Sequence, residues 1–99
     1  MPTLTLKPDT HVKLRYPMPE RGVIRFFVEA DIPVTTYVFD EQELREFYKS
    51  KNEFDSHGGF TYRRRHQQRL KLDFSGWWYL VIMNDSNTEP AAVYYEVSY

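Results

Sequence analysis

The chain has 99 residues, no cysteine and a net charge of −1, and 17% of its residues are aromatic. This length predicts one domain over residues 1–99. The lack of cysteine excludes disulfides, thiolate nucleophiles and cysteine-ligated zinc. The low net charge excludes a strong overall field toward nucleic acid or membrane. With no signal pattern and no run of about 20 apolar residues, we expect a soluble, cytoplasmic protein.

The N-terminal part predicts antiparallel strands. Polar and apolar residues alternate weakly in Thr3–Leu6 and clearly in His11–Tyr16, which is typical of half-buried strands. The prolines that follow interrupt pairing, because proline has no amide hydrogen for a ladder. Val23 to Ala30 predicts a third strand, Asp31-Ile32-Pro33 a turn, and Val34–Phe39 a fourth strand.

The hydrophobic period changes at Asp40. Asp40 is a favoured N-cap residue, and Glu43 lies three positions later, as in a capping box. Apolar residues then recur at helical spacing, which predicts a helix near residues 41–50. A polar loop through Gly58-Gly59 follows, and Phe60–Arg65 and Gln67–Phe74 predict two more strands.

The C-terminal third is the most apolar part of the chain. Trp77–Asn84 and Ala91–Tyr99 are rich in aromatic and β-branched residues, and the polar loop Asp85–Pro90 separates them. They predict a hairpin. Its register would build one apolar face from the pairs Ile82–Val93, Leu80–Tyr95 and Trp78–Val97. The opposite face would carry Trp77, Tyr79, Val81, Met83, Ala92, Tyr94, Glu96 and Ser98.

This second face has two interpretations. A helix or loop of the same chain covers it, or part of it is an exposed patch for a partner or a second copy, since contiguous exposed apolar area marks interaction sites. The connection at Ser75-Gly76 also has two interpretations. A tight hairpin would place Phe74 opposite Trp77, whereas an arch would carry the chain from one sheet to the other. The register of the last two strands favours the arch.

These elements predict an all-β fold: a two-sheet antiparallel β-sandwich of about seven to eight strands, jelly-roll-like, with one short helix. A closed small barrel is the main alternative. The expected core consists of inward-facing residues from four regions: Phe26, Val28, Leu72, Phe74, Trp78, Leu80, Ile82, Val93, Tyr95 and Val97.

The end of the chain resembles a known family. A strand that ends in Phe74, then Gly76, Trp78, Ile82 and Asn84, and then Val93, Tyr95 and Val97, is similar to the end of GOLD-type β-sandwich domains. The resemblance implies a jelly-roll-like sandwich that serves protein interactions. The chain departs from the secretory members, because it lacks their cysteine pair, signal peptide, coiled coil and membrane anchor.

The sequence offers little for catalysis. Asp55-Ser56-His57 supplies the residue types of a nucleophile and its base, but neighbouring loop positions do not converge in the geometry that this chemistry needs. His11, His57 and His66, with Asp55 or Asp73, match no compact zinc spacing. We therefore expect no enzyme, no metal and no cofactor.

The segment 62–71 carries five positive charges and no acid. Its arginines suit an edge strand that resists aggregation, an anionic protein partner, or single-stranded nucleic acid. Strand alternation argues against a single patch of all of them.

The sequence favours a non-enzymatic protein-interaction module, adaptor or accessory, with a protein partner or homodimer and no membrane. Its binding residues are expected to be Trp77, Tyr79, Val81, Tyr94, Arg63 and Arg65. The alternative is a nucleic-acid-binding domain that uses Arg63, Arg64, Arg65, Arg69 and Lys71.

Overall fold

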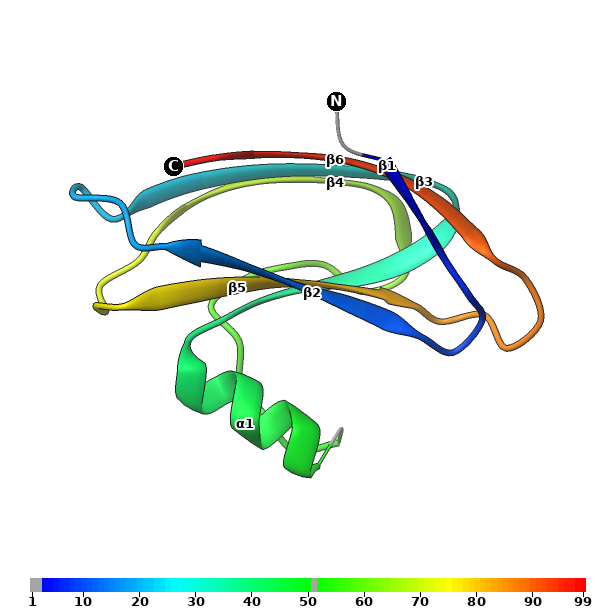
Figure 1. Ribbon diagram of the computed structural model, residues 1–99, viewed down its shortest axis with the longest axis horizontal. Helices are drawn as coiled ribbons and strands as arrows, with labels where there is room; N and C mark the ends of the chain where they lie inside the picture. The colour runs from blue at the N-terminus through cyan, green and yellow to red at the C-terminus, as the bar shows by residue number, and fades with distance from the viewer. Residues whose placement is uncertain (1–2, 51) are drawn as a thin grey trace.

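An antiparallel β-sheet and one short helix make up the computed structural model, which describes residues 3–50 and 52–99 (Figure 1). The predicted all-β class is confirmed. The elements in chain order are β1 (Thr3–Leu6), β2 (His11–Pro17), β3 (Val23–Phe39), α1 (Glu41–Lys49), β4 (Arg63–Lys71), β5 (Trp77–Asn84) and β6 (Ala91–Ser98).

The long strand β3 organises the sheet. The turn expected at Asp31-Ile32-Pro33 is wrong, because these residues lie within β3, which is 17 residues long. Instead, the strand changes partners there. Arg25–Ala30 pairs with β6, Val34–Phe39 pairs with β5, and the register with β4 shifts between Glu29 and Val34. Proline is tolerated at such an irregularity, where no ladder hydrogen is required.

Because β3 belongs to both halves, the six strands form one sheet in the order β1-β6-β3-β5-β2, with β4 also paired to β3. Figure 1 shows β6, β4 and the start of β3 above, and β5, β2 and the end of β3 below. The expected sandwich of two separate sheets is therefore replaced by a single curled half-barrel.

The predicted hairpin of the last two strands is wrong. β5 pairs with β2 and the end of β3, whereas β6 pairs with β1 and the start of β3. The loop between them crosses from the lower to the upper layer. Asn84 anchors this crossing, because its buried side-chain amide donates to the carbonyls of Leu6 (3.1 Å) and Glu89 (2.8 Å).

The segment expected to form two strands around His66 is instead the single strand β4. His66 stays in the ladder opposite Val28 and turns its side chain inward. The tight hairpin considered at Ser75-Gly76 does not form, since β4 pairs with β3 while β5 pairs with β2 and β3, and the chain passes there from the upper to the lower layer of the one sheet (Figure 1). Gly76 provides the left-handed backbone for this reversal, with φ +94°.

The core lies between the two layers. All residues of the predicted core set lie in it, some buried and some partly buried. Fully enclosed members come from β3, β5, β6 and the segment after β4: Phe26, Val28, Leu72, Trp78, Leu80, Ile82 and Val93. Phe74, Tyr95 and Val97 pack against them and are partly buried.

The predicted helix is confirmed as α1, with both hydrogen bonds of its capping box. The Asp40 carboxylate accepts from the Glu43 amide at 2.7 Å, and the Glu43 carboxylate accepts from the Asp40 amide at 3.0 Å. Leu44 and Phe47 point toward β5 and form a second apolar cluster with Phe39. The helix therefore covers one outer side of the half-barrel.

Candidate interaction surface

The residues expected to bind a partner separate into distinct environments. Tyr79 and Val81 are 7% and 0% exposed, because α1 packs over them with Phe39 and Phe47. The first interpretation of this face, that the chain covers it, therefore holds for these two residues. Neither can contact a partner while α1 stays in place.

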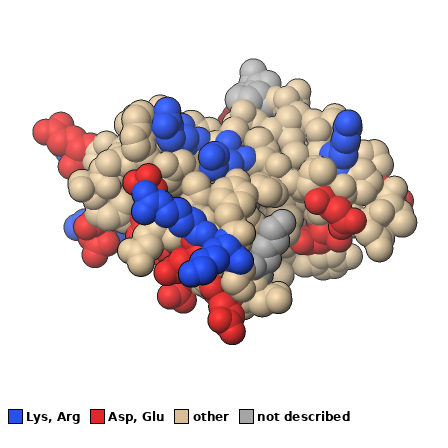
Figure 2. Space-filling model, turned by 60° about the horizontal axis from the view of Figure 1, so that its bottom comes forward, with Lys and Arg blue, Asp and Glu red and all other residues tan. Residues whose placement is uncertain are grey.

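Trp77 remains on the surface at 43% exposed, but it stands apart from the rest of the expected set. The guanidinium of Arg15 on β2 stacks over its ring at 4.2 Å. This contact gives Trp77 a partner within the chain. On the same side, around α1, Lys and Arg side chains lie among Asp and Glu side chains, so neither sign of charge dominates (Figure 2).

Tyr94 and Arg65 lie elsewhere, on the side of β4, β3, β6 and β1 that faces away from the core, called here the outer face. Cross-strand neighbours on this face form rows. The first row is Arg69, Arg25 and Ser98; the second is Gln67, Phe27 and Glu96; the third is Arg65, Glu29 and Tyr94. Lys71, opposite Val23, precedes the first row.

Phe27 is the residue that the sequence prediction missed. Its ring lies 5.9 Å from that of Tyr94, and the Arg65 guanidinium stacks over it at 5.3 Å. Arg65 also pairs with Glu29 at 3.5 Å. The alternation of β3 contains the signal, because Phe26 faces the core and its neighbour must face outward. An aromatic residue at that outward position indicated an aromatic contact on the outer face.

Tyr94 and Glu96 are joined on this face. The Tyr94 hydroxyl donates to the Glu96 carboxylate. This hydrogen bond, more than any other interaction, raises the pKa of Tyr94 to about 12, so the phenol keeps its proton at neutral pH. Glu96 thus has a fixed local partner.

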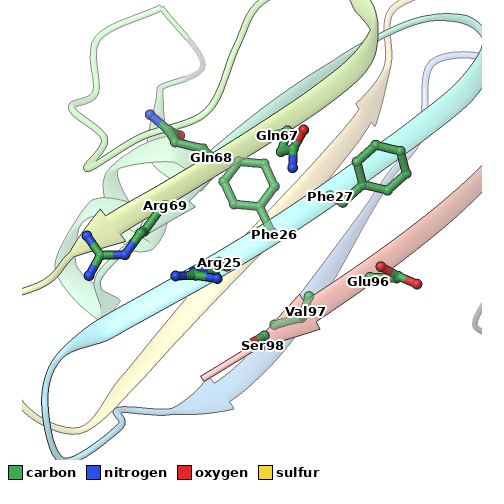
Figure 3. Close-up of a pocket in the computed structure, with 9 residues that line it drawn as sticks. All are labelled: Arg25, Phe26, Phe27, Gln67, Gln68, Arg69, Glu96, Val97 and Ser98. Atoms are coloured by element: carbon green, nitrogen blue, oxygen red, sulfur yellow. The ribbon is translucent and has the colours of Figure 1, made fainter.

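Two shallow cavities lie on the outer face. One of about 680 Å³ is lined by Arg25, Phe27, Gln67, Arg69, Glu96 and Ser98 (Figure 3). The other, of about 760 Å³, lies toward β1 and includes Glu29, Arg64, Arg65 and Tyr94. Arg63 makes a different contact, since its guanidinium stacks over Phe60 at 4.5 Å. The outer face therefore collects some of the expected basic residues and leaves out Arg63.

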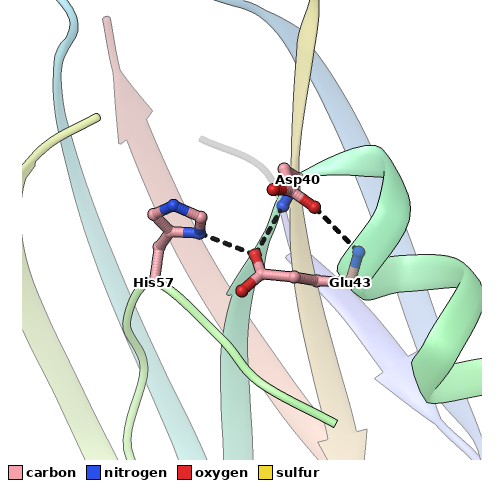
Figure 4. A network of polar contacts seen from close by, with 3 residues as sticks. All are labelled: Asp40, Glu43 and His57. Carbon is pink, nitrogen blue, oxygen red and sulfur yellow. Dashed lines mark hydrogen bonds and ion pairs between the residues drawn. The ribbon is translucent and has the colours of Figure 1, made fainter. Parts of the chain in front are cut away.

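A second polar cluster joins Asp40, Glu43 and His57 (Figure 4). One potential ligand atom from each residue lies within 4.8 Å of the others. The facing oxygens and nitrogen are already bonded: Asp40 and Glu43 cap α1, and the His57 Nδ1 contacts Glu43 Oε1 at 2.6 Å. The cluster therefore ties the loop after α1 back to the start of that helix. It provides structural support for the helix that covers β5.

The three histidines do not meet. His11 contacts the Tyr48 hydroxyl at 3.0 Å, and His57 contacts Glu43. His66 is fully buried where β3 bends, with Nδ1 2.8 Å from the Thr36 hydroxyl and Nε2 2.8 Å from the Arg63 carbonyl oxygen. Because a carbonyl only accepts, Nε2 carries the hydrogen. Burial lowers the pKa of His66 and favours this neutral form.

No protein-family model and no curated protein matches the chain. The resemblance of its C-terminal third to GOLD-type domains stays a prediction. Among the described residues, no helix combines the length and the apolar character that crossing a bilayer requires.

Proposed function

We propose that the chain is a non-enzymatic protein-interaction module, adaptor or accessory, whose partner binds the outer face. One observation carries this proposal: Phe27 and Tyr94 touch each other within three rows whose other side chains are polar and exposed. Aromatic residues flanked by arginine are typical of the centre of protein interfaces. The open rows of β4, β3 and β6 supply that arrangement.

The chemistry of this face describes the partner. An apolar side chain would pack on Phe27 and Tyr94, and acidic groups would meet the exposed guanidinium groups of Arg25 and Arg69. A protein surface fits better than a small molecule, because small ligands are usually enclosed on most sides and these cavities are shallow. A second copy of the chain is one such partner.

The proposal includes no catalytic step and no cofactor. His57, the histidine of the loop, is engaged by Glu43. In the described residues, no hydrogen bond joins the Ser56 hydroxyl to His57, so the pairing needed to activate a nucleophile is missing there. We also place the protein in the cytoplasm, since a chain with no cysteine suits a reducing compartment.

The test compares two charge-introducing substitutions. Phe27→Glu places a carboxylate at the centre of the outer face, and Trp77→Glu places one on the opposite side. Light scattering across a size-exclusion peak gives the oligomeric state of each variant. Any partner protein that binds the immobilised wild type is then purified, and its affinity for the wild type and for each variant is measured by calorimetry. We expect Phe27→Glu to abolish dimerisation or partner binding and Trp77→Glu to preserve it; the reverse pattern would refute the proposal.

A second candidate function has its own observation. Arg65, Arg69 and Lys71 occupy alternate positions of β4 and therefore share the outer face with Phe27. Basic side chains beside aromatic rings bind single-stranded nucleic acid through phosphate contacts and base stacking. The carboxylates of Glu29 and Glu96 on the same face oppose a polyanion.

Fluorescence anisotropy with a labelled oligothymidylate, measured over a range of salt concentrations, separates the two functions. Binding that falls steeply with salt and disappears in both Arg69→Gln and Phe27→Glu would establish the nucleic-acid function instead. We expect no binding above that of an acidic control protein.

A further inference from the structure

Two arginines on the outer face lie directly opposite each other. Arg25 on β3 pairs with Arg69 on β4 in the ladder, and both side chains are exposed. Like charges in directly opposite positions repel each other and destabilise a sheet. Within the described residues, neither guanidinium forms an ion pair that would offset this repulsion. The pair therefore indicates a place where a bound anion would supply the missing negative charge.

The surroundings of this pair complete an anion site. Both arginines line the cavity of about 680 Å³, together with Ser98 of the same row and Gln67 of the next row. Ser98 lies opposite Arg25 on the β6 side. The carboxylate of Glu96 also lines this cavity, but it accepts from Tyr94 and, in Figure 3, points away from the two arginines. The row of Arg69, Arg25 and Ser98 thus contains two positive charges and no carboxylate.

We propose that Arg25 and Arg69 bind a phosphate monoester carried by a side chain of the partner protein. This inference rests on the proposed function and names the group that anchors the partner. A phosphate monoester carries a charge of about −1.5 to −2 at neutral pH, which matches two guanidinium groups. Arginine also binds phosphate through paired hydrogen bonds. A single carboxylate would leave one guanidinium without a counter-charge.

The arrangement of charges favours one phosphate over a nucleic-acid strand. Lys71 precedes the arginine row, but the next two rows contain Glu96 and Glu29. A polyanion that extended along the face would therefore meet two carboxylates. A phosphorylated side chain needs only the arginine row, and its attached apolar or aromatic part would reach Phe27 in the neighbouring row.

Phenyl phosphate is the probe for this site. Its binding is followed by amide chemical shifts of the wild type, of Arg25→Gln and Arg69→Gln, and of Arg15→Gln, which removes the same charge from the opposite side. We expect shifts around positions 25, 69 and 98, and affinity weakened about tenfold or more by each of the first two substitutions. If Arg15→Gln weakens the affinity for phenyl phosphate equally, the effect reflects the overall charge of the protein, and the proposed site is overturned.

Two further ligands identify the anion. Benzoate at matched ionic strength carries a carboxylate on the same ring, and oligothymidylate carries phosphodiesters. Equal binding of benzoate would overturn the phosphate assignment, and tighter binding of oligothymidylate would replace the phosphoprotein with nucleic acid. If phenyl phosphate does not bind while Phe27→Glu still abolishes partner binding, the phosphate site is wrong and the interaction module stands.

Stability provides an independent readout. Arg69→Gln relieves the repulsion with Arg25, so we expect it to raise the melting temperature when no anion is present. Phenyl phosphate should raise the melting temperature of the wild type more than that of Arg69→Gln at the same ligand concentration, because the variant binds it more weakly. A lower melting temperature for Arg69→Gln would show that the pair supports the fold, and would overturn the inference.

Discussion

The two outer sides of the half-barrel differ in what covers them. On β5, Tyr79 and Val81 disappear beneath α1, and aromatic rings fill the space between helix and sheet. On β3 and β6, Phe27 and Tyr94 lie on a face formed by strand residues alone. Among the described residues α1 is the only helix, and it packs on the first side. On the second side, Phe27 and Tyr94 therefore lie among polar side chains with no helix over them.

Replacing one phenylalanine on each side by alanine should show this difference most strongly. Phe47 of α1 is fully buried against Phe39 and Phe54, so Phe47→Ala should lower the free energy of unfolding by about 3–5 kcal/mol. Phe27→Ala removes a ring from the outer face and should cost about 1 kcal/mol. Urea unfolding followed by tryptophan fluorescence measures both. Similar costs for the two substitutions would mean that the outer face is buried as well.

The next substitution destabilises α1, the helix that covers β5. Asp40→Ala removes the side-chain acceptor that caps α1 and should lower the free energy of unfolding by about 0.5–2 kcal/mol. The matched control is Asp55→Ala in the exposed loop after the helix, which should have little effect. Urea unfolding gives the free energies, and amide hydrogen exchange shows whether protection is lost first in α1. An equal loss of unfolding free energy in both variants would show that the capping box does not hold α1 in place.

The smallest effect at neutral pH concerns His66, which lies where β3 passes from one side of the half-barrel to the other. Burial holds the pKa of His66 below its usual value of 6.5. The unfolded chain therefore takes up a proton at higher pH than the folded chain. The stability that neutral His66 contributes is complete above about pH 6.5 and is lost as the pH falls toward the folded-state pKa.

Unfolding free energies measured between neutral and acidic pH test this. His66→Asn should flatten the loss of stability on acidification, because the titrating group is gone, whereas His11→Gln should keep it. A wild type whose stability does not change below pH 6.5 would contradict a buried neutral imidazole at the bend.

The sequence predicted those features that local patterns specify. Asp40 and Glu43 predict the helix, because capping is a contact between near neighbours in the sequence. Strand alternation assigns Trp78, Leu80 and Ile82 to the core. Strand pairing depends on contacts between distant residues, so the hairpin of β5 with β6 was wrong although the inward set was right. Both strands face the same core, whether they pair with each other or with two halves of β3.

The candidate site was harder to predict for the same reason. Alternation shows that Tyr79 and Tyr94 point away from the core, but it does not say that α1 covers only Tyr79. Phe27 lies in the strand before the helix, and its contact with Tyr94 spans most of the chain. Pro33 also misled the interpretation, because a turn and a change of strand partners produce the same local signal.

The most direct test uses the absence of cysteine, since each introduced thiol is then the only one in the chain. Phe27→Cys and Val81→Cys are treated with a maleimide at low protein concentration, where a second copy cannot cover either side. We expect the thiol at position 27 to react far faster than the thiol at position 81, which reacts only when the structure opens. Equal protection of the two thiols would contradict it, because the outer face would then be covered by the chain itself.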